Sequence, residues 1–239
     1  MSDAGAASRG VGVVVVAAGS GSRLGAARPK AFVEIAGRSL LERSLEVALV
    51  AGATSVVAVV PAELVDETTR MTGRLVGRDG VSVRVVPGGA ERTDSVRAGL
   101  AALGPECDVV LVHAAARCLT PVGVFERVIT AVAAGAGGAV PGLAVVDTVK
   151  IVDTRGVVTG TPDRATLRSV QTPQGFDAGV LRDAYSRADL TGAQATDDAA
   201  LVELSGHDVV VVEGDPLAFK ITTREDLHRA ERLLSETAG

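Results

Sequence analysis

Short runs of apolar, mostly β-branched residues alternate with amphipathic segments along most of the chain. The apolar runs predict strands at Gly12–Val16, Ser55–Val60, Ser82–Val86, Val109–Val112, Gly138–Val140, Thr148–Val152 and Asp208–Val212. The amphipathic segments predict helices at Leu40–Val50, Ala62–Val76, Asp94–Leu103, Val122–Ala134, Ala178–Arg187, Asp197–Leu204 and Arg224–Leu234. Strands that alternate with helices are typical of βαβ units, so the pattern predicts an α/β fold with a mostly parallel sheet.

Local signals add two helix starts and a hairpin. Thr120-Pro121 predicts an N-cap threonine followed by a proline at the first helical position. Residues 222–225 (TTRE) fit a capping box that begins at the first threonine. Residues 143–170 break the alternation, because Thr154–Gly156 joins two β-branched runs without a crossover helix. We therefore expect one domain, residues 1–239, with residues 143–170 as an arm subdomain for dimerisation or a lid.

Composition narrows the possible partners. The chain has 239 residues, 47% of them hydrophobic, which is enough for a sizeable core. It has no Trp and one Tyr, which argues against stacking on single-stranded nucleic acid. Its net charge of −5 gives no global basic field for nucleic acid or anionic membranes. We expect a cytoplasmic protein that binds neither.

The cysteines and the N-terminal valine run have ordinary structural interpretations. Cys107 and Cys118 fit neither a disulfide framework nor a zinc pattern, so we expect two reduced thiols in or near the core. The Val13–Val16 run lies close to the N-terminus, where a secretory signal is an alternative. Its valine-rich composition favours a first strand that is buried on both faces.

A glycine loop with basic residues follows this first strand. Gly19 and Gly21 fit the start of a dinucleotide-binding fingerprint, but Gly25 comes one position late. A P-loop is absent, because no glycine precedes a lysine. The basic residues of the same stretch are Arg23, Arg28 and Lys30. Ligands of open α/β sheets bind at the carboxyl ends of strands, so a phosphate-binding loop is favoured over a surface turn with solvated charges.

The loop and six later blocks carry a family resemblance. "AAGSGSRLGAARPKAF" resembles the G-x-G-x-R…P-K signature of nucleotidyltransferases. The later blocks are "GGAERTDSVRAGL", "LVHAAAR", "DTVK", "TPDRATLRSVQTPQGF", "TDDAALVE" and "GDPLAFKITTREDL". In this order and spacing the chain resembles the 2-C-methyl-D-erythritol 4-phosphate cytidylyltransferase family over nearly its whole length.

The resemblance implies a fold and a reaction. The implied fold is a Rossmann-like three-layer α/β/α nucleotidyltransferase domain with a protruding β-hairpin dimerisation arm. The implied reaction transfers a cytidylyl group from CTP to 2-C-methyl-D-erythritol 4-phosphate, giving CDP-methylerythritol and pyrophosphate for non-mevalonate isoprenoid synthesis. No covalent protein nucleophile is needed, because such a transfer depends on positioning and charge stabilisation.

Residue roles follow from the resemblance, position by position. The implied catalytic cations are Arg23, Lys30 and Lys220. The implied CTP-binding residues are Ala17, Ala18, Gly19, Gly21, Arg23, Lys30, Gly88, Gly89, Ser95 and Ala115. The implied residues on the polyol phosphate side are Thr148, Arg164, Thr172, Thr196, Lys220 and Arg117. Thr148 and Arg164 would reach from the arm into the partner's site in a homodimer.

One position departs from the family pattern. Ala114 stands where the family has an aspartate near the metal, so we expect no protein ligand at this position. We expect Mg²⁺, or another divalent cation, to be held mainly by the CTP phosphates. We expect the adjacent His113 to be packed at a strand end rather than catalytic. Two alternatives stay open: a cytidylyltransferase for another polyol phosphate such as ribitol 5-phosphate, and a nucleotide-binding paralogue with impaired turnover. The retained Arg23, Lys30 and Lys220 favour turnover.

Overall fold

A computed structural model describes residues 10–19, 28–75, 81, 83–191 and 195–237. Within these residues a central sheet of eight strands is formed, in the order β10-β7-β11-β6-β1-β4-β5, with β12 paired to β7. Its strands are β1 Gly10–Val16, β4 Ser55–Val60, β5 Val83–Pro87, β6 Cys107–Ala114, β7 Gly138–Ala144, β10 Arg168–Val170, β11 Gln174–Asp177 and β12 Val209–Glu213. The helices are α1 Leu40–Val50, α2 Val65–Thr72, α3 Arg92–Ala102, α4 Val122–Ala133, α5 Ala178–Thr191, α6 Asp198–Leu204 and α7 Arg224–Thr237.

Short elements complete the architecture. The 3₁₀ turns are η2 Lys30–Phe32, η3 Ala62–Leu64, η5 Ala115–Arg117, η6 Arg164–Thr166 and η7 Pro216–Ala218. Two small antiparallel ribbons are formed by β2 Glu34–Ile35 with β3 Arg38–Ser39, and by β8 Ile151–Val152 with β9 Val158–Gly160. None of the helices in the described part of the chain is long and apolar enough for a membrane span.

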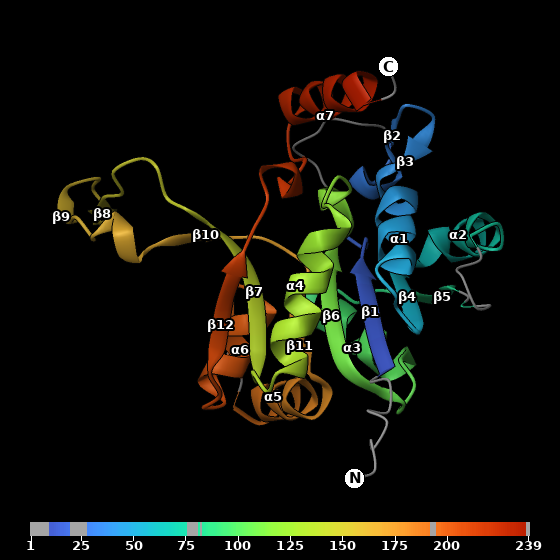
Figure 1. Cartoon of the computed structure of the whole chain (residues 1–239), viewed down its shortest axis with the longest axis horizontal. Helices are drawn as coiled ribbons and strands as arrows, with labels where there is room; N and C mark the ends of the chain where they lie inside the picture. The colour runs from blue at the N-terminus through green and yellow to red at the C-terminus, as the bar shows by residue number, and fades with distance from the viewer. Residues whose placement is uncertain (1–9, 20–27, 76–80, 82, 192–194, 238–239) are drawn as a thin grey trace, which may run out of the picture.

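The sheet is mostly parallel. Strand β1 pairs in parallel with β4 and β6, β4 with β5, and β12 with β7. Strand β11 runs antiparallel between β6 and β7, so that Gln174 lies opposite Val112 near the carboxyl end of β6. The ends of β1, β5, β6 and β12, and the start of β11, therefore meet at one edge of the sheet, which Figure 1 shows below α7.

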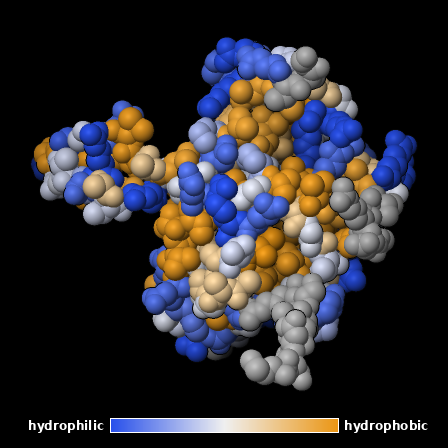
Figure 2. All heavy atoms as spheres, viewed as in Figure 1, coloured by the Kyte–Doolittle hydropathy of each residue, from blue (hydrophilic) through white to orange (hydrophobic). Residues whose placement is uncertain are grey.

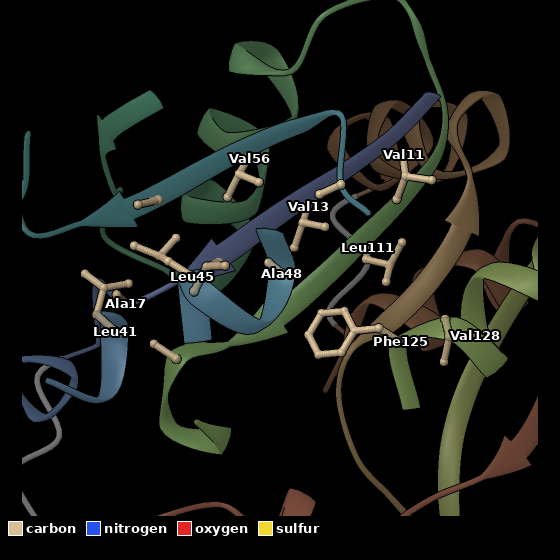
Figure 3. Close-up of a cluster of buried hydrophobic side chains, with 14 of the residues drawn as sticks. Val11, Val13, Ala17, Leu41, Leu45, Ala48, Val56, Leu111, Phe125 and Val128 are labelled. Atoms are coloured by element: carbon tan, nitrogen blue, oxygen red, sulfur yellow. The ribbon is translucent and has the colours of Figure 1, made fainter. Parts of the chain in front are cut away.

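Alternate side chains of the buried strands enter two separate core layers. On one face Val13, Val56 and Leu111 pack with helices α1 and α4. Figure 3 shows Leu45 and Ala48 of α1 lying over β1, and Phe125 of α4 beside Leu111. On the other face, valines of β1, β4 and β6 pack against α3, α5 and α6. Helices thus cover both faces, and the predicted three-layer α/β/α fold is confirmed.

Helix α7 lies outside these layers, at the carboxyl edge of the sheet (Figure 1). A third small cluster joins Ile35, Leu40, Cys118, Ile221 and Ala230. Because Ile221 follows Lys220 directly, this cluster anchors the segment that carries the lysine to the β2–β3 ribbon and to α7.

The predicted hairpin projects from the body as an arm (Figure 1). Its turn includes Gly156 at φ 81°, a backbone conformation that favours glycine. The arm buries little of its own apolar surface, because Val146 is 80% exposed and Ile151 is 55% exposed. Figure 2 shows apolar side chains interspersed with hydrophilic ones on this projecting part.

Three local predictions need correction. Helix α4 begins at Val122 with Pro121 as its N-cap, because the Thr120 hydroxyl donates instead to the carbonyl of Arg117 at 2.7 Å. The capping box at α7 lies one residue later than predicted and pairs Thr223 with Asp226. The first hairpin strand is shorter than predicted, because pairing with β9 begins at Ile151 rather than Thr148.

Candidate active site

A cleft of about 240 Å³ opens at the carboxyl edge of the sheet. The described residues that line it are Val16, Ala17, Ala18, Gly19, Lys30, Ala31, Gly89, Ala90, Glu91, Arg92, Ser95, Ala114, Ala115, Ala116 and Lys220. They come from the ends of β1 and β6, the start of α3, turn η2 and the segment after η7. Of the predicted CTP-binding residues, the cleft brings together Ala17, Ala18, Gly19, Lys30, Gly89, Ser95 and Ala115.

Two lysines line this cleft from opposite ends of the chain. Lys30 opens turn η2 directly after Pro29, and the buried Phe32 of the same turn anchors it in the core. Lys220 follows η7, where the Ile221 N–H donates to the carbonyl of Ala116 at 2.8 Å. The chain has three lysines in all, so the cleft gathers most of them beside a wall of small side chains. Arg23 and Gly21 lie outside the described residues.

The wall after β5 is shaped by glycines. A Cβ on Gly88 would overlap the Ala18 side chain and come within 2.8 Å of Ser95 Oγ, and a Cβ on Gly89 would overlap Asp94. The Gly89 N–H donates to Ser95 Oγ at 3.2 Å, and that hydroxyl donates to the carbonyl of Glu91 at 3.2 Å. The two glycines therefore let the chain after β5 pass close to Ala18 and to the start of α3. Gly88, which was also predicted to bind CTP, is not among the lining residues.

Arg92 forms part of the cleft wall and is held from behind by a buried carboxylate. Its guanidinium donates to both oxygens of Asp198, at 3.0 and 2.5 Å. Asp198 is fully buried and also accepts the Tyr185 hydroxyl at 2.5 Å. Burial lowers the pKa of Arg92, but the Asp198 charge outweighs this and raises it. Burial, together with the same charge, raises the pKa of Tyr185. The arrangement keeps Arg92 charged and fixed in direction.

His113 lies beneath the cleft in a buried position. It is fully buried, and its ring lies 5.0 Å from that of Phe125. Burial, with a smaller contribution from the Arg117 charge, lowers the pKa of His113 to about 3. The imidazole is therefore neutral at physiological pH, and its packed position agrees with the expectation for this residue. The next residue, Ala114, presents a methyl group where the family pattern has a carboxylate.

Of the residues predicted for the polyol phosphate, Lys220 lines the cleft of its own chain, and the other five are not among the lining residues. Thr148 and Arg164 lie exposed on the arm, where Arg164 Nη1 donates to the carbonyl of Val146 at 2.6 Å. Thr196 is exposed just before α6. Thr172 accepts the Ala114 N–H at 3.1 Å and lies 3.1 Å from His113 Nδ1.

Arg117 was predicted on the polyol phosphate side, and here its guanidinium contacts main chain. Nη1 donates to the carbonyl of Ala218 at 2.6 Å, and Nη2 donates to that of Val170 at 3.4 Å. Burial lowers its pKa from the ordinary arginine value. Arg117 thus ties the end of β6 to the segment before Lys220 and to the root of the arm.

Side chains that could hold a metal ion are few among the described residues of the cleft. Among the described residues, no three His, Cys, Asp or Glu side chains are grouped so that they could hold an ion. Glu91 is the one carboxylate among the described lining residues, and it forms a capping box with Asp94 at the start of α3. The two thiols, Cys107 and Cys118, are free and buried as predicted, and burial raises the pKa of Cys118 to about 12.

Sequence reasoning missed the Arg92–Asp198 pair. Both residues lie in blocks that carry the family resemblance, but they are 106 positions apart. A single sequence gives no local signal that one arginine and one aspartate at this separation will meet.

The sheet, the cleft at its carboxyl edge and the lysines in that cleft define the class: a nucleotidyltransferase of the three-layer α/β/α type. A family model described as 2-C-methyl-D-erythritol 4-phosphate cytidylyltransferase matches residues 11–236. The chain belongs to this family.

Relatives and solved structures agree with this membership. A 2-C-methyl-D-erythritol 4-phosphate cytidylyltransferase of Nocardia farcinica is 52% identical over 227 residues, covering 95% of this chain and 94% of that protein. A bifunctional IspD/IspF enzyme of Clavibacter michiganensis is 54% identical over 230 residues, covering 96% of this chain and 55% of that protein, so the chain spans about half of it. The crystal structure of the cytidylyltransferase from Thermus thermophilus gives a TM-score of 0.75 at 36% identity, covering 95% of this chain and 99% of that one.

Proposed function

We propose that this chain transfers the cytidylyl group of CTP to 2-C-methyl-D-erythritol 4-phosphate, releasing CDP-methylerythritol and pyrophosphate. The observation that carries the proposal is the family match over residues 11–236, on a cleft that Lys30 and Lys220 line. Nucleotidyl transfer needs cations around a phosphate chain, and the two lysines that line the cleft support the proposal.

The reaction proceeds by in-line displacement. A phosphate oxygen of the alcohol phosphate attacks the α-phosphorus of CTP, and the bond to the bridging oxygen of the β-phosphate breaks as pyrophosphate leaves. Lys30 and Lys220 stabilise the charge that develops on the phosphoryl oxygens, with Arg23 assigned the same task by the family pattern. A phosphate nucleophile is already ionised at neutral pH, so the reaction needs no general base, and the neutral, buried His113 is not required as one.

Divalent metal enters this proposal as part of the substrate. Because Ala114 supplies no oxygen ligand, we propose that Mg²⁺ arrives bound to the CTP phosphates. In this proposal the chain itself contributes positive charge to the binding of the phosphates, through Lys30 and Lys220 in the cleft lining.

The arm is proposed to form a homodimer. The exposed apolar residues of the arm support this, since packing against a second copy of the chain would remove their surface from water. The exposed positions of Thr148 and Arg164 leave both side chains accessible to that second copy. In that dimer Thr148 and Arg164 would complete the partner's alcohol phosphate site. We also propose the cytoplasm as the compartment, since the reaction consumes CTP.

The decisive experiment is a panel assay of pyrophosphate release. Purified protein is incubated with CTP, Mg²⁺ and each of several polyol phosphates, including 2-C-methyl-D-erythritol 4-phosphate and ribitol 5-phosphate. Release with methylerythritol phosphate alone supports the proposal. Preference for ribitol 5-phosphate assigns a different alcohol, and CTP binding without turnover on any alcohol assigns a nucleotide-binding paralogue.

A further inference from the structure

The segment 171–174 (QTPQ) joins β10 to β11 at the carboxyl edge of the sheet. Its two glutamines are almost fully buried, with 5% of Gln171 and 2% of Gln174 exposed. Neither residue lines the cleft, and the proposed reaction gives neither of them a role. A buried amide is costly unless its donor and acceptor are both paired, so the partners of these two side chains show what the segment holds in place.

Gln171 holds the segment that leads to Lys220. Its Nε2 donates to the carbonyl of Asp215 at 2.8 Å, and its Oε1 accepts the N–H of Asp215 at 3.0 Å. One side chain thus pairs with both main-chain groups of one residue, as a neighbouring strand would. The fit is close, because a Cβ on Gly214 would overlap Gln171 Oε1.

The path from Asp215 to Lys220 is short and fixed at several points. Asp215 Oδ1 accepts the N–H of Leu217 at 2.8 Å, which starts turn η7. Arg117 holds the carbonyl of Ala218 at 2.6 Å, and the Ile221 N–H is bound by Ala116. At the upstream end, Gln171 holds Asp215 directly after the last main-chain bond to β7, in which the Gly214 N–H donates to the carbonyl of Gly142 at 3.1 Å.

Gln174 holds the start of helix α6, which lies behind the Arg92 side of the cleft wall. Its Nε2 donates to Asp197 Oδ2 at 2.8 Å, and its Oε1 accepts the N–H of Ala199 at 3.3 Å. Asp197 is the N-cap of α6, with its other oxygen accepting the Ala200 N–H at 3.0 Å. The next residue is Asp198, the buried carboxylate that fixes Arg92 in the cleft wall.

Thr172 ties the segment between the two glutamines to β6. Its hydroxyl oxygen accepts the Ala114 N–H at 3.1 Å, at the floor of the cleft. The four residues are therefore joined to the Lys220 segment, to the end of β6 and to the start of α6.

We infer that Gln171 and Gln174 are positioning residues with separate targets: Gln171 places Lys220, and Gln174 places Arg92 through the start of α6. The kinetic part of this inference rests on the proposed function. Because Lys220 acts on charge that develops during transfer, loss of Gln171 lowers kcat. Arg92 belongs to the cleft wall, which would contact CTP as soon as the nucleotide binds. Loss of Gln174, which places Arg92, therefore weakens CTP binding.

Hydrogen–deuterium exchange tests the positioning without any need for turnover. Gln171→Met and Gln174→Met keep the length of the side chain and remove both hydrogen bonds, and each variant serves as the control for the other. We expect faster exchange in peptides covering 214–221 for Gln171→Met, and in peptides covering 197–204 for Gln174→Met. Equal effects on both segments, or no change in the segment assigned to each residue, would overturn the inference. Should a Met variant fail to fold, the Glu variant, which keeps the acceptor but loses the donor, is measured instead with the same expectation.

Kinetics then separate the two roles. Gln171→Met is expected to lower kcat by about ten- to a hundredfold with the calorimetric Kd for CTP little changed, and Gln174→Met to raise that Kd by about tenfold. In a Lys220→Ala background the effect of Gln171→Met on kcat should nearly vanish, because the group that it places is gone. A full additional loss in the double variant contradicts the role through Lys220. If the wild type turns over no alcohol phosphate, the proposed function fails, while exchange and CTP binding still decide the positioning roles.

Discussion

Lys30 is one of the cations to which the proposed function assigns stabilisation of the transition state. It lines the cleft from turn η2, whose other residues are buried, so its replacement leaves the local fold in place. We predict that Lys30→Ala lowers kcat by about a hundredfold or more, the effect of removing one group that stabilises charge in a transition state. Pyrophosphate release measures this, with Arg70→Ala on the surface of α2 as a control for the loss of one positive charge. A Lys30→Ala enzyme with near wild-type kcat would remove this lysine from the mechanism.

Ala114 lines the cleft at the position where the proposed use of divalent metal can be tested. A carboxylate at this point of the cleft lining would add an oxygen ligand for Mg²⁺ beside the nucleotide phosphates. We predict that Ala114→Asp lowers the Mg²⁺ concentration for half-maximal rate severalfold, whereas Ala114→Asn, which adds a neutral oxygen, has a smaller effect. Superimposable Mg²⁺ titrations of the three proteins would show that position 114 does not tune metal use.

Sequence reasoning reached the residues of the cleft unevenly. The loop that begins at Gly19 was predictable, because ligands of open α/β sheets bind at the carboxyl ends of strands, whereas the role of Gly89 came from the family resemblance. Lys220 was identified through the family resemblance together with its apolar neighbours Phe219 and Ile221, since a lysine before a helix is otherwise typical of a solvated position. Arg92 and Asp198 were missed, because their roles arise from a contact between distant parts of the chain.

Helices and strands with a clear hydrophobic pattern were predicted with their bounds. A strand that forms because neighbouring strands pair with it was not predicted. Strand β4 and helix α1 have the predicted bounds, because Ser55–Val60 is a continuous apolar run and Leu40–Val50 a clear amphipathic repeat. Strand β11 was missed, since Gln174–Asp177 (QGFD) contains a glycine and two polar residues and becomes a strand through its neighbours β6 and β7. Periodicity detects burial on a face, but it does not detect a strand that exists because two others flank it.

The start of helix α7 gives a prediction for stability against pH. Asp226 Oδ2 accepts hydrogen bonds at 2.8 Å from the Thr222 N–H, the Thr222 hydroxyl and the Thr223 N–H. Burial acts to raise the pKa of Asp226, but these bonds overcome it and lower the pKa to about 2. A carboxyl whose pKa is lowered by folding stabilises the fold fully when the pH is above its pKa in the unfolded chain. This stabilisation is lost as the pH falls through the pKa of the folded state, about 2.

We therefore predict that Asp226→Ala lowers the free energy of unfolding by about 1 kcal/mol at neutral pH. The difference from wild type should shrink as pH falls toward 2, the native pKa of this carboxyl. Denaturant titrations at several pH values measure it, with the exposed neighbour Glu225→Ala as the control. A difference that stays constant from neutral to acid pH would mean that the ionised carboxylate is not what stabilises the helix start.

At the scale of the whole molecule, the proposed function assigns one reaction to residues of the cleft and to residues of the projecting arm. Lys30 lines the cleft, while Arg164 lies exposed on a projection of the same chain. In the proposed dimer, each site combines the cleft of one subunit with the arm of the other. A variant in the cleft damages the site of its own subunit, whereas a variant in the arm damages the site of its partner. A dimer with one subunit of each kind can therefore contain one intact site, although neither parent protein has any.

We predict that Lys30→Ala and Arg164→Ala proteins, each nearly inactive alone, recover activity when they are unfolded together and refolded. A dimer of one subunit of each kind has one site with both residues intact and one with neither. Random pairing therefore restores about a quarter of the wild-type rate. Pyrophosphate release after mixing measures the recovery, and sedimentation checks that dimers have formed. Dimers without recovery would mean that Arg164 serves the cleft of its own chain, because each mixed dimer would then carry one defect in each site.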